Sequence, residues 1–94
     1  MNKDFEDENI LHIELSKGNK KAFTFLFKEH YPRVCSYIYS LSKNRKVTED
    51  VAQSTFTTLW EKRESIKISK SIKSYLFTIA YNKFLDEIKK SKNE

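Results

Sequence analysis

The sequence predicts an all-α fold, a compact bundle of three to four helices, and three observations support this prediction. The 94 residues are enough for one domain with a modest core and too few for two. One Gly and one Pro leave little material for the hairpins and tight turns of a β-sandwich or barrel. A 38% hydrophobic share, with 14% aromatic residues, indicates a small and dense core. We therefore expect residues 1–94 to form a single helical domain.

The N-terminal region is predicted to contain one short helix. Residues 1–8 are polar and mostly acidic, and we expect them to be disordered. Asn9 to Lys17 holds closely spaced apolar side chains, and Gly18 can adopt the left-handed conformation that ends a helix. The alternation at positions 13–15 would also permit a strand. No segment nearby could pair with such a strand, so the helix is the better prediction.

A second and longer helix follows, with Asn19 as its N-cap. Its apolar side chains fall within an arc of about 120°. This pattern continues through Pro32, where a proline removes one backbone hydrogen bond and costs about 3 kcal/mol. We expect one helix with a kink between Lys28 and Pro32, or two helices broken there. His30 lies on the apolar arc and is interpreted as a residue at the edge of the core. The arc consists of Phe23, Leu26, Phe27, His30, Val34, Tyr37, Ile38 and Leu41.

The stretch from Thr48 to Glu64 is predicted to be an amphipathic helix, and the chain is organised around it. Thr48 can cap this helix, while Glu49 and Asp50 suit the positive end of its dipole. The side opposite the apolar one contains no Lys or Arg, although the chain as a whole is basic. It is either an ordinary solvated surface or a flat acidic surface for a cationic partner. The apolar side comprises Val51, Ala52, Phe56, Leu59 and Trp60, and the polar side comprises Asp50, Gln53, Ser54, Thr57, Glu61 and Glu64.

A basic, partly apolar loop is predicted at Ser65 to Lys73, where Ile alternates with Lys or Ser. The pattern would fit a short strand, but such a strand would have no partner. The last helix starts at Ser71 or Ser74 and continues to about Lys92. Its first and second halves place apolar residues on nearly opposite sides, so we expect neighbouring segments to cover it from two directions. A polar stripe remains through Thr78, Asn82, Asp86 and Lys89.

The charge of the chain is unevenly distributed around its net value of +5. Residues 17–46 carry eight positive charges and one negative, whereas residues 1–16 carry one positive and five negative. This segregation is a weak indication of nucleic-acid binding. Cys35 is the single cysteine, no apolar run approaches the length of a membrane span, and the N-terminus lacks the regions of a secretion signal. We expect a cytoplasmic protein without a membrane partner.

The chain contains no pattern of residues for catalysis. His12 and His30 are too few for a metal cage, and Cys35 has neither a CxxC partner nor a base nearby. Gly18 stands alone, so no glycine-rich phosphate loop is present. We therefore predict that the protein is not an enzyme and needs no metal or other cofactor.

Two surfaces remain as candidates for binding. The acidic side of the Thr48–Glu64 helix, including Glu61, would suit an Arg- and Lys-rich helical partner. The loop at Ser65–Lys73, with Asn82 and Lys83 on the helix that follows, offers cations for phosphates and an amide that can read a base edge. Aromatic residues interleaved with lysines between Lys73 and Lys90 are typical of single-stranded binding. The residues alone leave open a helical protein-interaction adaptor without nucleic-acid binding, or a duplex-binding regulator.

The order of these segments resembles region 2 of a bacterial sigma factor of the extracytoplasmic-function (ECF) type. The resembling stretches are AFTFLFKEHYPRVCSYI, TEDVAQSTFTTLWEKRESI and SIKSYLFTIAYNKFLDEIKK, which together span roughly residues 18–92. The resemblance implies a helical domain that docks on the clamp helices of the RNA polymerase β′ subunit. It also implies recognition and melting of the promoter −10 element through its non-template strand, and allows an anti-sigma factor as a further partner.

The resemblance also assigns roles to individual positions of this chain. Asn82 matches an Asn that contributes to the pocket for a flipped −10 base. Lys83, Lys89 and Lys90 would be contacts to the DNA backbone. The polymerase surface would comprise Asp50, Gln53, Ser54, Thr57 and Trp60, with Glu61 beside them, and the non-template strand would meet Ser65, Ile66, Lys67 and the start of the last helix at Lys73.

Three departures from the family pattern limit these expectations. Ser54 occupies a position where family members usually have Glu, which could shift the clamp contact onto Glu61. The loop is rich in Ile and Lys, so its promoter preference cannot be copied from the family. The helix-turn-helix of the second domain, which reads the −35 element, is absent from this sequence. We therefore expect weak, salt-sensitive DNA binding from the free domain, and strand recognition once polymerase fixes the geometry.

Overall fold

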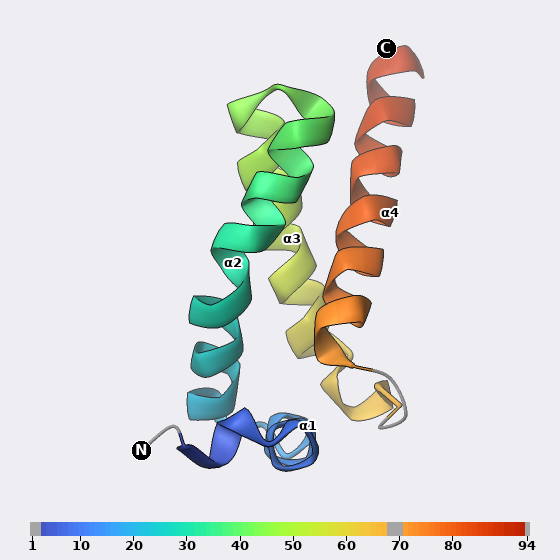
Figure 1. The fold of residues 1–94 in the computed structure, drawn as a ribbon. Helices are drawn as coiled ribbons and strands as arrows, with labels where there is room; N and C mark the ends of the chain where they lie inside the picture. The colour runs from blue at the N-terminus through green and yellow to red at the C-terminus, as the bar shows by residue number, and fades with distance from the viewer. Residues whose placement is uncertain (1–2, 68–70, 94) are drawn as a thin grey trace.

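The computed structural model describes residues 3–67 and 71–93, which are helical apart from short connections (Figure 1). No strand occurs in this part of the chain, and the predicted all-α bundle is confirmed. None of the described helices combines the length and the apolar character needed to cross a bilayer. The elements in order are a 3₁₀ turn η1 (Lys3–Glu6), α1 (Glu8–Ser16), α2 (Lys20–Ser42), α3 (Arg45–Glu61), a 3₁₀ turn η2 (Arg63–Ser65) and α4 (Ile72–Asn93).

The helices α2, α3 and α4 form an elongated bundle, and α1 lies across one end of it (Figure 1). The α2–α3 pair is an antiparallel hairpin, and α4 packs mainly on α3. Short α1 contacts α2 and η2, so it lies at the same end of the bundle as the start of α4. The core runs along the length of the bundle and draws on every α-helix. Its buried apolar residues are Leu11, Leu15, Ala22, Leu26, Val34, Ile38, Val51, Ala52, Phe56, Leu59, Ile66, Ile72, Leu76, Ala80 and Phe84.

Residues 3–8 of the segment that we expect to be disordered form a 3₁₀ turn and the start of α1 in the structure. The carboxylate of Asp7 accepts hydrogen bonds from the backbone N–H groups of Asn9 and Ile10, so it caps α1 one position earlier than expected. The ring of Phe5 lies against that of Phe25, with centroids 5.7 Å apart. A local cap and an aromatic contact therefore order this acidic segment, and neither is visible in its composition. Residues 1–2 lie outside the described part of the chain.

The turn between α1 and α2 forms as predicted. Gly18 has φ +86°, and its N–H donates to the carbonyl of Leu15, while the N–H of Asn19 donates to that of Glu14. These two bonds are the Schellman arrangement that closes a helix C-terminus. The Asn19 side chain then accepts from the N–H of Lys21 and caps α2. Both predicted roles, that of Gly18 and that of Asn19, are confirmed.

The second helix is one helix and not two. It runs without interruption from Lys20 to Ser42 with Pro32 inside it. Proline has no N–H, so the Lys28 carbonyl lacks its usual intrahelical partner. Packing of the apolar arc on both sides of Pro32 compensates for this loss, because Leu26 and Val34 are both fully buried.

The start of α3 differs from the prediction. Asn44, and not Thr48, is the N-cap, since its side chain accepts from the N–H of Val47. Thr48 is buried inside the helix, where its hydroxyl donates to the Asn44 carbonyl and lies 3.1 Å from the Ser42 hydroxyl. Arg45 and its neighbour therefore form the first turn in place of Glu49 and Asp50. The connection between α2 and α3 therefore consists of Lys43 and Asn44.

The last helix begins directly after Ser71, the earlier of the two predicted starts. The Ser71 hydroxyl accepts from the N–H of Ser74, as an N-cap does. The expectation that neighbours cover α4 from two directions is wrong for its second half. There Tyr81, Leu85 and Ile88 are 43%, 36% and 37% exposed. The bundle supplies partners for one side of α4 only.

Candidate polymerase and nucleic-acid interfaces

The outward side of α3 carries carboxylate, amide and hydroxyl groups at three- and four-residue spacing. Its other side packs on α2 and α4, so these groups point away from the bundle. All are exposed except Ser54, which is half-buried. No ion pair joins Glu61 to any residue that the structure describes. We call this surface the α3 polar face, and it consists of Asp50, Gln53, Ser54, Thr57 and Glu61.

A cation lies at one end of the α3 polar face, which was not expected. Because the helix begins at Arg45, Lys46 lies one turn before Asp50, and its Nζ is 3.4 Å from Oδ1 of Asp50. The polar side of residues 48–64 contains no Lys or Arg, and this cation comes from the extra turn that precedes the predicted start of the helix. An exposed pair at this spacing is worth only about 0.3–0.5 kcal/mol. Asp50 can consequently exchange Lys46 for another cation at little cost.

Trp60 is engaged within the molecule. Its ring meets that of Phe23 edge to face, with centroids 5.2 Å apart. The guanidinium carbon of Arg63 lies 4.2 Å from the Trp60 ring centroid, and an Arg63 N–H donates to the Trp60 carbonyl. The half-buried side chain thus fastens the end of α3 to α2 and η2. Its remaining surface lines a shallow pocket with Lys20 and Thr24, so only part of the ring is open to a partner.

A pocket of about 270 Å³ lies where the candidate DNA-binding loop meets α4. It is lined by Ser65, Ile66 and Lys67 from the segment after α3 and by Tyr75 from the first turns of α4. Ile66 is only 8% exposed and provides an apolar floor, whereas Ser65 and Lys67 are exposed. The fold therefore brings three of the predicted DNA contacts together with an aromatic ring. Residues 68–70 of the predicted loop lie outside the described part of the chain.

Asn82 and Lys73 are not part of this pocket. Asn82 is exposed on α4 but lies two turns beyond Tyr75, about 10 Å along the helix axis. Lys73 is exposed as well, yet it lies about 160° around the helix from Tyr75. Its charge acts on His30 of α2, so it belongs to the side of α4 that faces α2. The predicted DNA contacts thus include one cluster, Ser65–Lys67 at the pocket, and other residues that lie apart from it on α4.

The remaining predicted DNA contacts follow Asn82 toward the C-terminal end of α4. Lys89 and Lys90 are exposed, and Lys83 is half-buried. The polar stripe through Thr78, Asn82, Asp86 and Lys89 is confirmed, because all four are exposed. This stripe leads away from the pocket along the outer surface of α4. It is suited to a backbone that continues beyond the pocket.

The family assignment follows from a match to a family model. Residues 26–94 match sigma-70 region 2, a range that includes most of α2 and all of α3, η2 and α4. The chain belongs to this family. The predicted resemblance is confirmed, and both candidate surfaces lie inside the matched range. The sigma factor family is not an enzyme family, which agrees with the prediction of a non-enzymatic protein.

Two curated relatives that the domain resembles are ECF-type factors. It is 27% identical over 79 residues to the ECF RNA polymerase sigma factor SigW of Bacillus subtilis, covering 84% of this chain and 42% of that protein. It is 28% identical over 75 residues to the ECF RNA polymerase sigma factor RpoE of Cereibacter sphaeroides, covering 79% of this chain and 41% of that protein. The chain thus spans about two fifths of the length of these relatives. No solved structure matches it.

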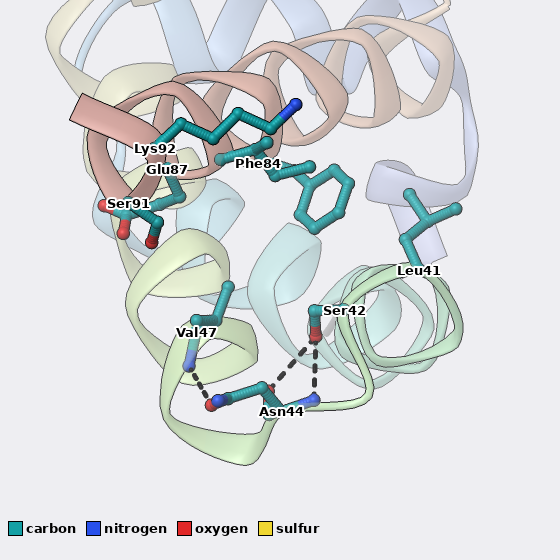
Figure 2. Close-up of a pocket in the computed structure, with 9 residues that line it drawn as sticks. Leu41, Ser42, Asn44, Val47, Phe84, Glu87, Ser91 and Lys92 are labelled. Atoms are coloured by element: carbon teal, nitrogen blue, oxygen red, sulfur yellow. Dashed lines mark hydrogen bonds between the residues drawn. The ribbon is translucent and has the colours of Figure 1, made fainter. Parts of the chain in front are cut away.

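The sequence analysis of this region 2 domain missed a pocket at the opposite end of the bundle. It has a volume of about 360 Å³ and lies between the α2–α3 turn and the last turns of α4 (Figure 2). Phe84 and Ile88 of α4 form its apolar wall together with Leu41 and Val47. Asn44 lies at its edge, where it accepts from the N–H of Val47. The signal was present as the second apolar side of α4, which we assigned to burial.

Burial shifts the pKa of Cys35 and of Tyr31 on α2 of the region 2 domain. Desolvation raises the pKa of the Cys35 thiol, with the hydrogen bond from Tyr31 acting against it. Desolvation also raises the pKa of the Tyr31 hydroxyl. A thiol held in its protonated form is a poor nucleophile, so Cys35 is a packing residue. In the described residues, no three His, Cys, Asp or Glu side chains are grouped as metal ligands would be.

His30 should make the stability of the region 2 domain dependent on pH. Burial lowers its pKa from the usual 6.5, assisted by Arg33 and Lys73 and opposed by Glu29 and Glu8. The folded state therefore favours the neutral imidazole more than the unfolded chain does. The resulting stability is present above pH 6.5 and is lost as the pH falls through the lower, folded-state pKa.

We expect His30→Gln to flatten this dependence. Urea unfolding between about pH 7.5 and pH 5.5 should show a steeper loss of stability in the wild type than in the variant. Above this window the two proteins should have parallel pH profiles. Equal slopes in the window would mean that the burial of His30 does not influence its proton affinity.

Proposed function

We propose that the domain acts in transcription initiation by docking its α3 polar face on the β′ clamp helices of RNA polymerase. In the same complex, its Ser65–Tyr75 pocket receives a base from the non-template strand of the promoter −10 element. The observation that carries this proposal is the adjacency of the two surfaces. The α3 polar face ends at Glu61, and the pocket begins at Ser65, one 3₁₀ turn further along the chain.

Docking would rely on charge and on groups that are already in place. Asp50 and Glu61 are exposed on one rigid helix, with hydroxyl and amide groups between them. A cationic helix such as the clamp is attracted to these carboxylates from a distance and forms hydrogen bonds to them on contact. Little conformational freedom is lost on binding, because the α3 polar face belongs to a helix that is packed on two others.

Strand recognition would work by differential binding. Taking a base out of the duplex stack costs a few kcal/mol. Stacking on an aromatic side chain such as Tyr75 returns about 1–3 kcal/mol per base, and lysines along α4 attract the phosphates. The apolar floor at Ile66 favours an unpaired base that enters the pocket over the same base exposed to water. The domain thus holds the opened strand better than the closed duplex, and catalyses no covalent step itself.

The location of Asn82 suggests that it reads a different base from the one in the pocket. Its amide is exposed two turns beyond Tyr75, about 10 Å along the helix axis, so a base seated in the pocket would not be expected to reach it. An Asn side chain can form a bidentate contact to adenine. Lys89 and Lys90 lie farther along the same surface, where they would neutralise phosphates.

Two binding measurements test the proposal. A β′ clamp-helix fragment should capture the 94-residue chain, and capture should weaken as salt rises. The domain bound to core polymerase should then bind a single strand that has been enriched from a random pool, whereas the free domain should bind it weakly. Capture that fails in low salt would contradict the docking step. Tight, sequence-specific duplex binding by the free domain would contradict the polymerase-dependent mechanism.

Replacing Asn82 by Ala should lower the affinity of the polymerase-bound domain for the enriched strand by about tenfold, the effect of losing one good base contact. Ala is a better helix former than Asn, so the fold should not suffer. Clamp capture should be unchanged. The measurement is a fluorescence anisotropy titration with the enriched strand and with a scrambled strand.

The control for Asn82→Ala is Lys89→Ala, a change two turns farther along the same stripe. Lys89→Ala should lower the affinity for the enriched and the scrambled strand equally. It should also reduce the salt dependence of binding by about one phosphate contact. If Asn82→Ala also weakened the two strands equally, the amide would not be a base reader.

A further inference from the structure

The first helix touches both sides of the segment that holds the candidate pocket. At one end of α1, Oε1 of Glu8 accepts a hydrogen bond of 2.8 Å from the backbone N–H of Ile72, 64 residues away. At the other end, the turn at Gly18 lies against the Arg63 guanidinium of η2, and α1 as a whole contacts η2. The helix therefore connects the start of α4 to the residues that precede Ser65.

The bond from Ile72 to Glu8 adds a second cap to the start of α4. The first N–H groups of a helix have no intrahelical partner, and a carboxylate is the acceptor best suited to them. Ser71 satisfies the N–H of Ser74, while Glu8 satisfies that of Ile72, whose side chain is fully buried. One cap is therefore local, and the other comes from a separate helix. The distant cap fixes where α4 begins relative to α1.

Neighbouring charges do not supply another partner for Glu8 among the described residues. Lys73 and Glu8 both act on His30 of α2, so the three groups lie on the same side of the α4 start. No ion pair joins Glu8 to a described Lys, Arg or His. The α4 amide is thus the group that Glu8 holds. The family match begins at residue 26, so neither Glu8 nor the rest of α1 belongs to the matched region.

We infer that Glu8 is a positioning residue for strand recognition: by binding the Ile72 N–H it holds Tyr75 at the correct place against Ser65–Lys67, so that the pocket exists before DNA arrives. This inference rests on the proposed function of the pocket. Tyr75 lies one turn after Ile72, and its own N–H donates to the Ser71 carbonyl in the same first turn. A shift of that turn would move the ring that forms one wall of the pocket. Preorganisation of this kind raises affinity without adding a contact to the ligand.

The test compares Glu8→Ala and Glu8→Gln with the wild type, each bound to core polymerase. Glu8→Ala should weaken binding of the enriched single strand by about tenfold, the effect of losing one hydrogen bond to a charged group. Glu8→Gln keeps an acceptor oxygen, so its affinity for the enriched strand should be close to that of the wild type. Amide exchange at residues 72–75 should accelerate in Glu8→Ala and return toward wild type in Glu8→Gln. Clamp capture should be the same for all three proteins.

A matched control separates positioning from stability. Asn44→Ala removes the cap of α3 at the other end of the bundle, so it destabilises the fold without changing any residue that lines the pocket at Ser65–Lys67 and Tyr75. The two variants are compared under conditions in which their thermal stability is equal. If Asn44→Ala then weakened strand binding as much as Glu8→Ala, the effect of Glu8 on binding would come from the stability of the fold alone. If both Glu8 variants bound the strand more tightly, Glu8 would act through charge repulsion, and the inference would be overturned.

The wild-type arm distinguishes failure of this inference from failure of the proposed function. A wild-type complex that does not bind the enriched strand would refute the function of the pocket. A wild-type complex that binds it, with Glu8→Ala equally tight, would refute only the positioning role of Glu8.

Discussion

Asp50→Lys is expected to abolish capture of the chain by the β′ clamp helices. Asp50 is exposed at the N-terminal end of the α3 polar face, and its partner in the structure is the exposed cation Lys46, 3.4 Å away. Losing one partner of a close charge pair at an interface typically costs 2–5 kcal/mol, which corresponds to a fall in affinity of about 30-fold or more. The reversed charge adds repulsion against a cationic clamp. Pull-down and titration at low salt would measure the loss.

The fold of the Asp50→Lys variant should be intact. A like-charge pair with Lys46 costs only a few tenths of a kcal/mol on a helix surface, by the usual effect of about 0.2–0.5 kcal/mol. Glu29→Lys is the matched control, because it makes the same charge change at an exposed position of α2. Capture of Glu29→Lys should resemble the wild type. Equal loss in both variants would indicate a general effect of net charge and would remove Asp50 from the interface.

Phe56→Ala should nearly unfold the domain. The side chain is 2% exposed, and its ring centroid lies 6.4 Å from that of Phe23, 5.1 Å from Phe27 and 5.8 Å from Tyr31. Truncating a buried Phe costs about 3–5 kcal/mol, while a domain of this size has a total stability of about 5–14 kcal/mol. At roughly 4–8 °C per kcal/mol, the midpoint of thermal unfolding should fall by about 12–40 °C.

The aromatic cluster also explains why Phe56→Ala should affect clamp capture indirectly. Phe56 anchors α3 to α2 from the side opposite the α3 polar face, so a loosened α3 would present that face less rigidly. Phe56→Leu keeps most of the buried area and should lose about 1 kcal/mol or somewhat more. Tyr39→Ala, at a side chain that is 50% exposed, should change stability by less than about 0.5 kcal/mol. A Phe56→Ala protein with unchanged melting would contradict the central role of the cluster.

The successes of the sequence analysis share one property: their causes are local. Helical periodicity gave the core positions Leu26, Val34 and Ile38 of the α2 arc and most of the inner side of α3, which are buried as expected. Phe27 and Leu41 of the same arc are 37% and 41% exposed. Gly18, Asn19 and Ser71 act through bonds to residues within five positions. Such bonds depend on residue type and spacing, which a sequence displays directly.

Most differences between prediction and structure arise from contacts between segments that are distant in the sequence. The N-terminal segment is ordered by Phe5 against Phe25 and by Asp7, and the first of these contacts joins different elements. Thr48 has a side chain that can cap a helix, but Asn44, four residues earlier, is the residue that caps α3. The outer side of α4 was assigned to burial because it is apolar, yet burial requires a neighbour. The bundle has no further helix for it in the part of the chain that the structure describes.

The sequence predicted which residues belong to the candidate site. The fold decided which of them lie together and which lie apart. The α3 polar face follows from one helix, so its members could be grouped from spacing alone. The pocket needed α4 to return beside the end of α3, which brought Tyr75 to Ser65 and left Asn82 and Lys73 elsewhere. No spacing rule could have linked Glu8 to Ile72 across 64 residues.

By itself, the sequence determined that this chain is helical, where most of its helices start and stop, and which family it belongs to. These properties follow from periodicity, from side chains that bond to their own neighbourhood and from motifs in fixed order. The tertiary structure alone decided which apolar side of α4 is buried, where the pocket forms and which helix caps α4. Burial and long-range hydrogen bonds are properties of pairs of segments, and a pair exists only once the chain has folded back on itself.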